Sequence, residues 1–405
     1  MLIQILGLGD IHIQTNSRFL IGRMKKDLYL SFVVLFQMIV TTIQLSLPLL
    51  GVVSTETAAT YRVAITLLTY LPGVVIVMQR RLVSLLLAFA SYVILLLVSY
   101  EFFPESHRFI ESSQAVSLTP IAILTILFMM SIRDFSNFEK MLLLVSRIAV
   151  FISLLYVVAH TLSPFRELDD TYSMSFGYSM LLPAMFLFTQ QGYFDKTASL
   201  LLFVLILLDG SRGPVLVLGI FYVYYTLFMS TTRTKMRMIL VGLVAITAAV
   251  VILPRLESFR NSRTIYLLQE GELVSHDSGR DEKMYSVVTP HIMERPITGW
   301  GVGADRYFLD GAYSHSIFLE VFLHYGIIIG SFLFLYLFGY CLKTYFSPLM
   351  RKVPLAKEMF VMMFLYGLIP KLFSGSYLID FSFAIFMGYL LSVRRHLRRS
   401  AAISA

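Results

Sequence analysis

Residues 82–100 read LVSLLLAFASYVILLLVSY and contain no charged side chain. About 20 apolar residues cross a bilayer as a helix, because lipid offers the backbone polar groups no other hydrogen-bonding partner. Similar apolar runs recur along the whole chain. We therefore expect an all-α, polytopic integral membrane protein with about 12 transmembrane helices. The candidate spans are 28–50, 62–78, 82–100, 114–132, 141–163, 172–190, 197–209, 213–230, 237–253, 316–341, 357–370 and 377–393.

The composition supports this fold class and excludes others. Of the 405 residues, 57% are hydrophobic and 14% are charged, whereas about a quarter of the residues of a soluble domain are charged. A soluble enzyme, a disordered chain and a nucleic-acid-binding protein are therefore excluded, and the expected environment is the lipid bilayer. The single Cys341 excludes an internal disulfide and a cysteine metal cluster. Without an internal repeat or a linker, residues 1–405 are expected to form a single transmembrane domain.

The distribution of basic residues predicts the orientation. If the N-terminus lies inside, most Lys and Arg residues of the short connections fall on the cytoplasmic side, including Arg80, Arg81, Arg133, Arg394 and Arg395. Cytoplasmic connections of membrane proteins carry such an excess. The multi-pass protein is therefore expected to have both termini in the cytoplasm. The short outer connections contain only Arg62, Arg108, Arg166, Arg212 and Lys371.

Residues 254–315 form a long outer loop whose charges the topology does not explain, since loops of this length are translocated largely regardless of charge. Its middle, Asp281–Glu294, has apolar residues at helical spacing. Gly299, Gly301 and Gly303 follow in a turn that supports the loop or forms an anion-binding nest.

The loop arginines differ in their expected roles. Arg263 and Arg280 lie next to turn residues and are the better candidates for binding a phosphate through bidentate hydrogen bonds. The remaining loop arginines are expected to be solvated, and these are Arg255, Arg260, Arg295 and Arg306.

A second candidate site is the turn Asp209-Gly210-Ser211-Arg212-Gly213-Pro214 at the outer end of span 197–209. Gly210 and Gly213 allow the backbone to bend or to approach a ligand closely. The turn presents the Arg212 guanidinium beside a helix N-terminus, where phosphate binds well. The alternative is an Arg212 that pairs with Asp209 and has no ligand.

The third candidate site lies where the outer loop enters span 316–341. His315 at this boundary could act as an acid or a base near neutral pH. Glu320 lies about one turn into the span, where a carboxylate indicates a functional site. Glu320 and His324 are four residues apart on one helix face, so a purely structural pair is the alternative. No ATP-binding or zinc-protease motif is present.

Taken in order, these motifs resemble the bacterial O-antigen and capsular polysaccharide polymerase/ligase superfamily. The resemblance covers roughly residues 205–330. It rests on Gly210-Ser211-Arg212-Gly213, Arg280 at the start of a loop helix, Pro296 followed by Gly299-Trp300-Gly301-Val302-Gly303, Ser314-His315-Ser316, Phe318-Leu319-Glu320 and Tyr325-Gly326. The superfamily often has Asn where this chain has Ser316.

The resemblance implies a membrane-embedded (GT-C-like) glycosyltransferase in the bacterial inner membrane, with its active site facing the periplasm. Its donor and acceptor would be glycans linked to undecaprenyl diphosphate, without a nucleotide sugar, metal or other cofactor. A flippase and a chain-length regulator would be its partners in O-antigen, capsule or exopolysaccharide synthesis. The resemblance assigns Arg212, Arg280 and Arg263 to the diphosphate, His315 to the acceptor or the diphosphate, and Glu320 to an alternative base.

Three functions remain open. A polymerase, which the resemblance favours, joins repeat units to one another, and a ligase transfers the glycan to lipid A-core. A transporter or lipid-linked oligosaccharide flippase is the alternative from a different class. Transporters often contain repeated halves and polar residues at mid-bilayer, whereas this chain has its polar clusters at the outer boundary. We therefore favour an enzyme.

Overall fold

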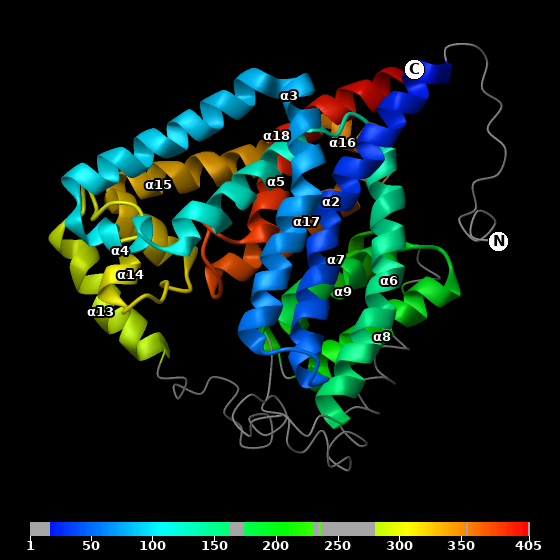
Figure 1. Cartoon of the computed structure of the whole chain (residues 1–405). Coiled ribbons are helices and arrows are strands. Elements are labelled where there is room, and N and C mark those ends of the chain that lie inside the picture. Colours follow the sequence, from blue (N-terminus) through cyan, green and yellow to red (C-terminus); the bar gives the residue numbers. More distant parts are fainter. Residues whose placement is uncertain are drawn as a thin grey trace.

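The computed structural model describes residues 17–162, 174–209, 211–229, 235, 280–353 and 355–403, and in these residues it contains helices and no strand (Figure 1). Within these described ranges, six helical segments are long and apolar enough to cross a membrane. The all-helical membrane fold is thereby confirmed, whereas the count of about 12 spans stays a prediction. The predicted span 237–253 lies outside the described residues.

Most of the predicted spans coincide with helices of the structure. The principal helices are α2 (Ser17–Leu49), α3 (Thr55–Phe102), α5 (Thr119–Ser131), α6 (Phe135–Leu162), α7 (Met174–Thr189), α8 (Tyr193–Asp209), α9 (Arg212–Tyr224), α15 (Ile317–Tyr345), α17 (Ala356–Gly367) and α18 (Phe381–Ile403). Short helical turns connect them, and a π-helical segment at Tyr225–Met229 continues α9.

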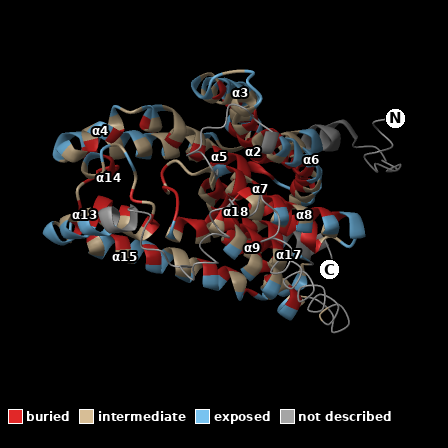
Figure 2. Ribbon diagram, turned by 90° about the horizontal axis from the view of Figure 1, so that it is seen from below, coloured by how far each residue is buried: buried red, intermediate tan, exposed pale blue. Residues whose placement is uncertain are grey.

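Helix α7 lies at the centre of the bundle. Its residues from Met180 to Thr189 are all buried, and it packs against α2, α6, α8, α9 and α17. A helix that is apolar on every side must be surrounded by other elements. Figure 2 shows the buried residues concentrated around α7 and α18.

Helix α3 has the opposite environment, because most of its apolar side chains are exposed. Leu68, Val83 and Leu97 are examples. Apolar side chains along a helix of this length indicate a surface that faces lipid. The helix includes both predicted spans 62–78 and 82–100, and the expected loop between them is instead a kink at Arg81, where φ is −151° and ψ is 41°.

Residues 280–315, the described part of the long loop, pack on one flank of the molecule, against the start of α15 (Figure 1). They contain α13 (Arg280–Glu294) and α14 (Asp305–Phe308), so the helix predicted at Asp281–Glu294 is confirmed. Val288 and Ile292 of α13 are buried with Leu323 of α15 in a small apolar cluster. This cluster fixes the loop to the helix that carries Glu320.

Backbone contacts fix the same junction more tightly. Gly326 interrupts α15 with φ 80° and ψ 165°, a conformation that favours glycine. A Cβ atom there would lie 2.5 Å from the Ile297 carbonyl oxygen. The amide of Ile327 donates a hydrogen bond of 2.6 Å to the carbonyl oxygen of Pro296. The kink in α15 therefore provides the surface on which the loop lies.

Candidate functional site

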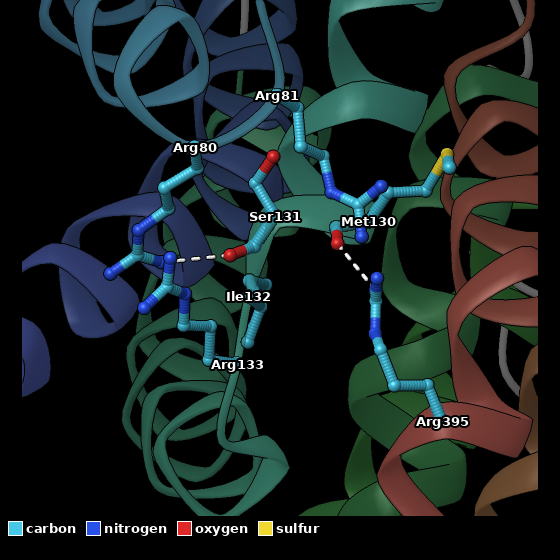
Figure 3. Close-up of a pocket in the computed structure, with 7 residues that line it drawn as sticks. All are labelled: Arg80, Arg81, Met130, Ser131, Ile132, Arg133 and Arg395. Atoms are coloured by element: carbon cyan, nitrogen blue, oxygen red, sulfur yellow. Dashed lines mark hydrogen bonds between the residues drawn. The ribbon is translucent and has the colours of Figure 1, made fainter. Parts of the chain in front are cut away.

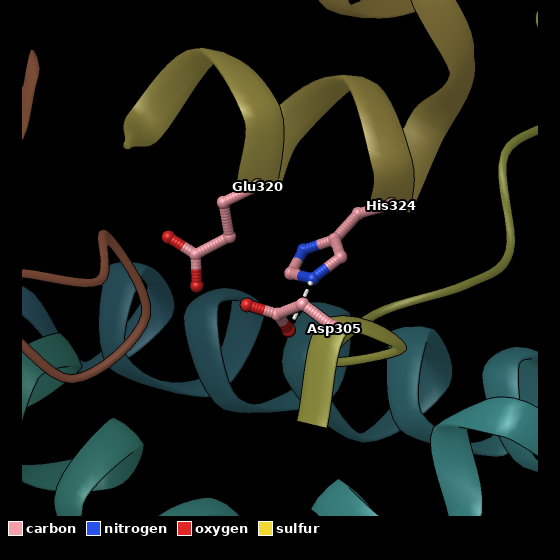
Figure 4. Close-up of side chains that lie close together, drawn as sticks. All are labelled: Asp305, Glu320 and His324. Atoms are coloured by element: carbon pink, nitrogen blue, oxygen red, sulfur yellow. Dashed lines mark hydrogen bonds and ion pairs between the residues drawn. The ribbon is translucent and has the colours of Figure 1, made fainter. Parts of the chain in front are cut away.

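Four ionisable side chains of α14 and α15 form a buried cluster where the loop before α15 meets the bundle. The Arg306 guanidinium donates through Nη1 to Asp305 Oδ1 at 2.6 Å and to Glu320 Oε1 at 2.8 Å. His324 Nε2 lies 3.0 Å from Asp305 Oδ1 (Figure 4). All four side chains are at most 2% exposed. Burying these charges is tolerable only because each has an oppositely charged partner.

A second loop, residues 371–380 between α17 and α18, completes the cluster. Ser376 Oγ donates to Glu320 Oε1, and the Tyr377 amide donates to Glu320 Oε2 at 3.0 Å. Ser376 Oγ also accepts a hydrogen bond of 2.8 Å from Arg306. An ion pair between Lys371 and Asp380 closes the base of the loop. Glu320 thus accepts hydrogen bonds on both carboxylate oxygens.

The imidazole of His324 connects the carboxylates to two tyrosines. Its Nδ1 lies 3.0 Å from the hydroxyl of Tyr377, which donates to the hydroxyl of Tyr325. Its Nε2 is within 3.1 Å of the Gly303 amide as well as near Asp305. The ring thus connects Asp305 and the glycine-rich turn on one side to the two tyrosines on the other.

The electrostatic environment favours the charged forms of Asp305 and Arg306, the two ionisable residues of α14 in the cluster. Burial alone would raise the pKa of Asp305, but the Arg306 charge and the His324 hydrogen bond hold this pKa below its ordinary value. Burial likewise acts to lower the pKa of Arg306, while the charges of Asp305 and Glu320 raise it. The pair therefore remains charged across the physiological range.

The cluster also has donor atoms suited to a metal ion. Ligand atoms of Asp305, Glu320 and His324 lie within 4.8 Å of one another, and carboxylate with imidazole is a common ligand set. However, the Arg306 guanidinium already bonds both carboxylates, and its positive charge would repel a cation at this position. The donor set therefore fits a structural ion network better than a metal centre.

His315 lies in the turn that leads into α15. Its φ of 52° is uncommon for a residue other than glycine, and its ring centroid is 4.3 Å from that of Tyr313. The preceding residue, Ser314, donates its amide to Asp305 Oδ2 at 2.9 Å. Asp305 thus ties the turn to the ion cluster. Unlike the cluster, His315 is partly exposed.

Arg212 is the first residue of α9, as the turn motif predicts. The carboxylate of Asp209 accepts hydrogen bonds from Ser211 Oγ at 2.7 Å and from the hydroxyl of Tyr156 at 3.1 Å. The turn lies close against α7, because a Cβ on Gly177 would be 2.8 Å from Ser211 Cβ and Pro214 Cγ. The start of α9 therefore has a defined position.

Gly213 connects this turn to the loop at residues 371–380. A Cβ atom at Gly213 would collide with the hydroxyl of Tyr178 and lie 3.2 Å from the ring of Phe373. The Lys371 ammonium lies 5.8 Å from the centroid of the Tyr178 ring. The loop thus contacts the surroundings of Arg212 through Phe373 and those of Glu320 through Ser376 and Tyr377.

The glycine-rich turn supports the loop and does not form an anion-binding nest, so the nest interpretation is wrong. The amides of Trp300 and Gly301 donate to the carbonyl oxygens of Leu323 and His324 at 2.8 and 3.2 Å. Gly299, Gly301 and Gly303 all have positive φ. A Cβ on Gly299 would be 2.5 Å from the His324 backbone. Protein acceptors therefore occupy the amides that an anion would need.

The expectation that Arg306 is solvated is also wrong, since its side chain is 2% exposed. Arg295 is half-buried and lies over the Trp300 ring at 3.8 Å. Asp305, Ser376 and Tyr377 were not singled out in the sequence. Arg280 begins α13. The described residues leave out Gly210, Arg255, Arg260, Arg263 and the side chain of Arg280.

The fold and the site define a polytopic membrane protein with a buried ion cluster at the junction of α15, a candidate membrane span, and the preceding loop. A family model described as O-antigen ligase matches residues 197–335. This match includes both the Arg212 turn and the Asp305–His324 cluster, and it supports the resemblance to the O-antigen polymerase/ligase superfamily. No curated protein and no solved structure is significantly similar to the chain.

Proposed function

We propose that the protein is a polysaccharide polymerase that joins oligosaccharide repeat units linked to undecaprenyl diphosphate. The reaction would occur at the outer face of the bacterial inner membrane. The family match over residues 197–335 carries the proposal, because it supports an O-antigen polymerase or ligase-type activity. The exposed apolar side chains of α3 suit a protein that binds a polyprenyl substrate within lipid.

The proposed reaction is a glycosyl transfer. An acceptor hydroxyl would lose its proton to His315 and bond to the anomeric carbon of the donor glycan. The bond from that carbon to the diphosphate oxygen would break, and undecaprenyl diphosphate would leave. Arg212, together with Arg280 and Arg263, would neutralise the charge of the leaving diphosphate, an electrostatic contribution that is often the largest in such steps. No step requires a metal.

The structural setting of His315 supports this role. Asp305 holds the preceding Ser314 amide, and the positive φ of His315 is a strained conformation of the kind that clusters at functional sites. Glu320 is 1% exposed and its oxygens already accept several hydrogen bonds. We therefore assign Glu320 to positioning, and His315 to proton transfer.

The orientation belongs to the same proposal. We place both termini in the cytoplasm and residues 254–315 in the periplasm, as the basic residues predict. In agreement, the beginning of α2 and the end of α18 lie at the same end of the bundle in Figure 1.

Deletion of the gene, followed by gel analysis of the surface glycan and of the lipid-linked intermediates, tests the function. Loss of a polymerase leaves single repeat units on the lipid anchor. A ligase, which the description of the family model favours as the second candidate, would instead leave long chains on undecaprenyl diphosphate. Lipid-linked units that face the cytoplasm would support the flippase and contradict both enzymes.

A further inference from the structure

A cavity of about 320 Å³ lies among α3, α5 and α18, away from the residues of the Asp305–His324 cluster. Four of its lining residues are arginines, and none of the described lining residues is acidic. The lining consists of Arg80, Arg81, Met130, Ser131, Ile132, Arg133 and Arg395. The kink of α3 at Arg81 and the end of α5 at Ser131 bring these residues together.

Two of the arginines are held in place by the backbone at the end of α5. Arg80 donates to the Ser131 carbonyl oxygen and Arg395 to that of Met130, each at 2.7 Å (Figure 3). Arg80 also forms an ion pair with Asp27. These contacts fix the direction of both side chains, so a ligand would meet ordered guanidinium groups.

Two buried polar groups at the cavity have unused hydrogen-bonding capacity. Arg80 Nη2 and Ser131 Oγ are buried, and neither has a hydrogen-bond partner among the described residues. The Arg80 side chain is 6% exposed. A buried donor without a partner costs about 1–3 kcal/mol. Both groups can donate to an anionic oxygen, so an anionic ligand in the cavity would satisfy them.

Helix capping alone does not account for this arrangement. The carbonyl groups at the end of α5 carry a partial negative charge that attracts basic side chains. Contacts with Ser131 and Met130 account for one nitrogen each of Arg80 and Arg395. They leave Arg80 Nη2 and the hydroxyl of Ser131 without a role, in a cavity with two further arginines.

We propose that this cavity binds a phosphate group, held by Arg80, Arg81, Arg133, Arg395 and Ser131. Guanidinium groups suit phosphate oxygens because they offer paired donors in one plane. The distribution of basic residues predicts that this end of the bundle faces the cytoplasm, where anionic phospholipid headgroups lie. The phosphate could belong to such a headgroup or be a soluble phosphate. This site is independent of the proposed glycosyl transfer.

Thermal unfolding of the full chain in a neutral detergent tests the proposal. Cys341 is the single cysteine and is buried, so a thiol-reactive dye reports unfolding. We expect phosphatidylglycerol, or inorganic phosphate, to raise the Tm, and phosphatidylcholine to raise it much less. A response to the lipid alone identifies a headgroup as the source, and a response to inorganic phosphate alone identifies a soluble anion.

Three variants locate the binding. Arg81→Gln and Arg395→Gln should each raise the half-saturating concentration of the effective probe by about tenfold, the loss expected for one charged hydrogen bond. Ser131→Ala should also weaken the response, while the Tm without probe stays equal or rises, because the variant removes a buried unsatisfied group. Because Ser131→Ala should not destabilise the protein, a weaker response of this variant reports lost binding of the probe and not a partly unfolded protein.

Arg398→Gln is the matched control, because Arg398 is exposed on the same helix as Arg395 and its loss changes the net charge equally. It should respond as the wild type does. The proposal is overturned if all four variants respond alike, if phosphatidylcholine acts as strongly as phosphatidylglycerol, or if neither phosphate probe changes the Tm.

Discussion

Arg306 and Glu320 form an ion pair of 2.8 Å between two fully buried side chains that are 14 residues apart in the sequence. The pair joins α14 to the first turn of α15. Exposed ion pairs contribute little to stability, but loss of one member of a buried pair leaves the other charge uncompensated. Variants that lose one member of the pair should therefore be less stable than the wild type.

We expect Arg306→Met to destabilise the protein by roughly 3–5 kcal/mol. The cause is that the carboxylates of Asp305 and Glu320 then lack their common partner. The double variant Arg306→Met with Glu320→Gln should recover part of the loss in a thermal unfolding measurement. Arg398→Gln is the control for the loss of a positive charge. A change in Tm no larger than that of the control would show that the pair does not support the fold.

Stability should also depend on the ionisation of Asp305. Because the folded state holds the pKa of Asp305 below its ordinary value, this carboxylate stabilises the fold fully above about pH 4 and loses this effect as the pH falls further. The difference in Tm between wild type and Asp305→Asn should therefore shrink between about pH 6 and pH 3. A difference that is the same at both pH values would contradict the charge argument.

His315→Ala should reduce glycan transfer by about 10²–10⁴-fold, the usual contribution of a general acid or base, and leave the Tm nearly unchanged. The measurement is the yield of long-chain glycan on gels, with membrane protein levels compared by blot. His107→Ala is the matched control, since His107 stacks on Tyr100 outside the site. Wild-type chain lengths in the His315 variant would remove this residue from the mechanism.

Arg212→Ala should abolish long-chain glycan, and Arg212→Lys should restore only part of it, because lysine keeps the charge without the paired donors. Gel analysis of both variants gives the answer. Arg108 pairs with the exposed Asp310, so Arg108→Ala controls for the loss of one arginine charge. If lysine supports full activity, charge alone suffices. If alanine does, Arg212 does not bind the diphosphate.

Gly326→Ala should destabilise the protein by about 1–3 kcal/mol, as expected where an added methyl group has no room. The reasons are the positive φ and the nearby carbonyl oxygen of Ile297. Gly339→Ala on the same helix has nothing within 4 Å of the new Cβ, and it should be neutral or slightly stabilising. Equal thermal unfolding of the two variants would show that the kink is not required.

The apolar runs predicted the helices well, because lipid imposes one solution on each run. The break at residues 79–81 was also predicted, but as a loop rather than a kink. The ion cluster could not be predicted in the same way. Glu320 was visible because a carboxylate in a span is costly.

The partners of Glu320 are harder to find in the sequence. Asp305 and Arg306 lie in a polar loop, where charged residues are ordinary. Ser376 is 56 residues from Glu320 along the chain, and helical spacing carries no information about such a contact. A signal that could have found Arg306 is its position three residues after Gly303, because the glycine-rich turn lies against α15.

The backbone contact between Gly326 and residues 296–297 has a consequence for motion. Because residues 296–301 are joined to α15 through main-chain hydrogen bonds, and α14 is joined to α15 through ion pairs, a tilt of α15 would carry Asp305, Arg306 and His324 along as one rigid unit. Two sets of contacts must then separate. One set joins Ser376 and Tyr377 to Arg306 and Glu320, and the other joins residues 302–310 to Ser99, Arg108 and Gln114. A motion that admits a large substrate would therefore open the loop before α18 and the contacts with residues 99–114 together.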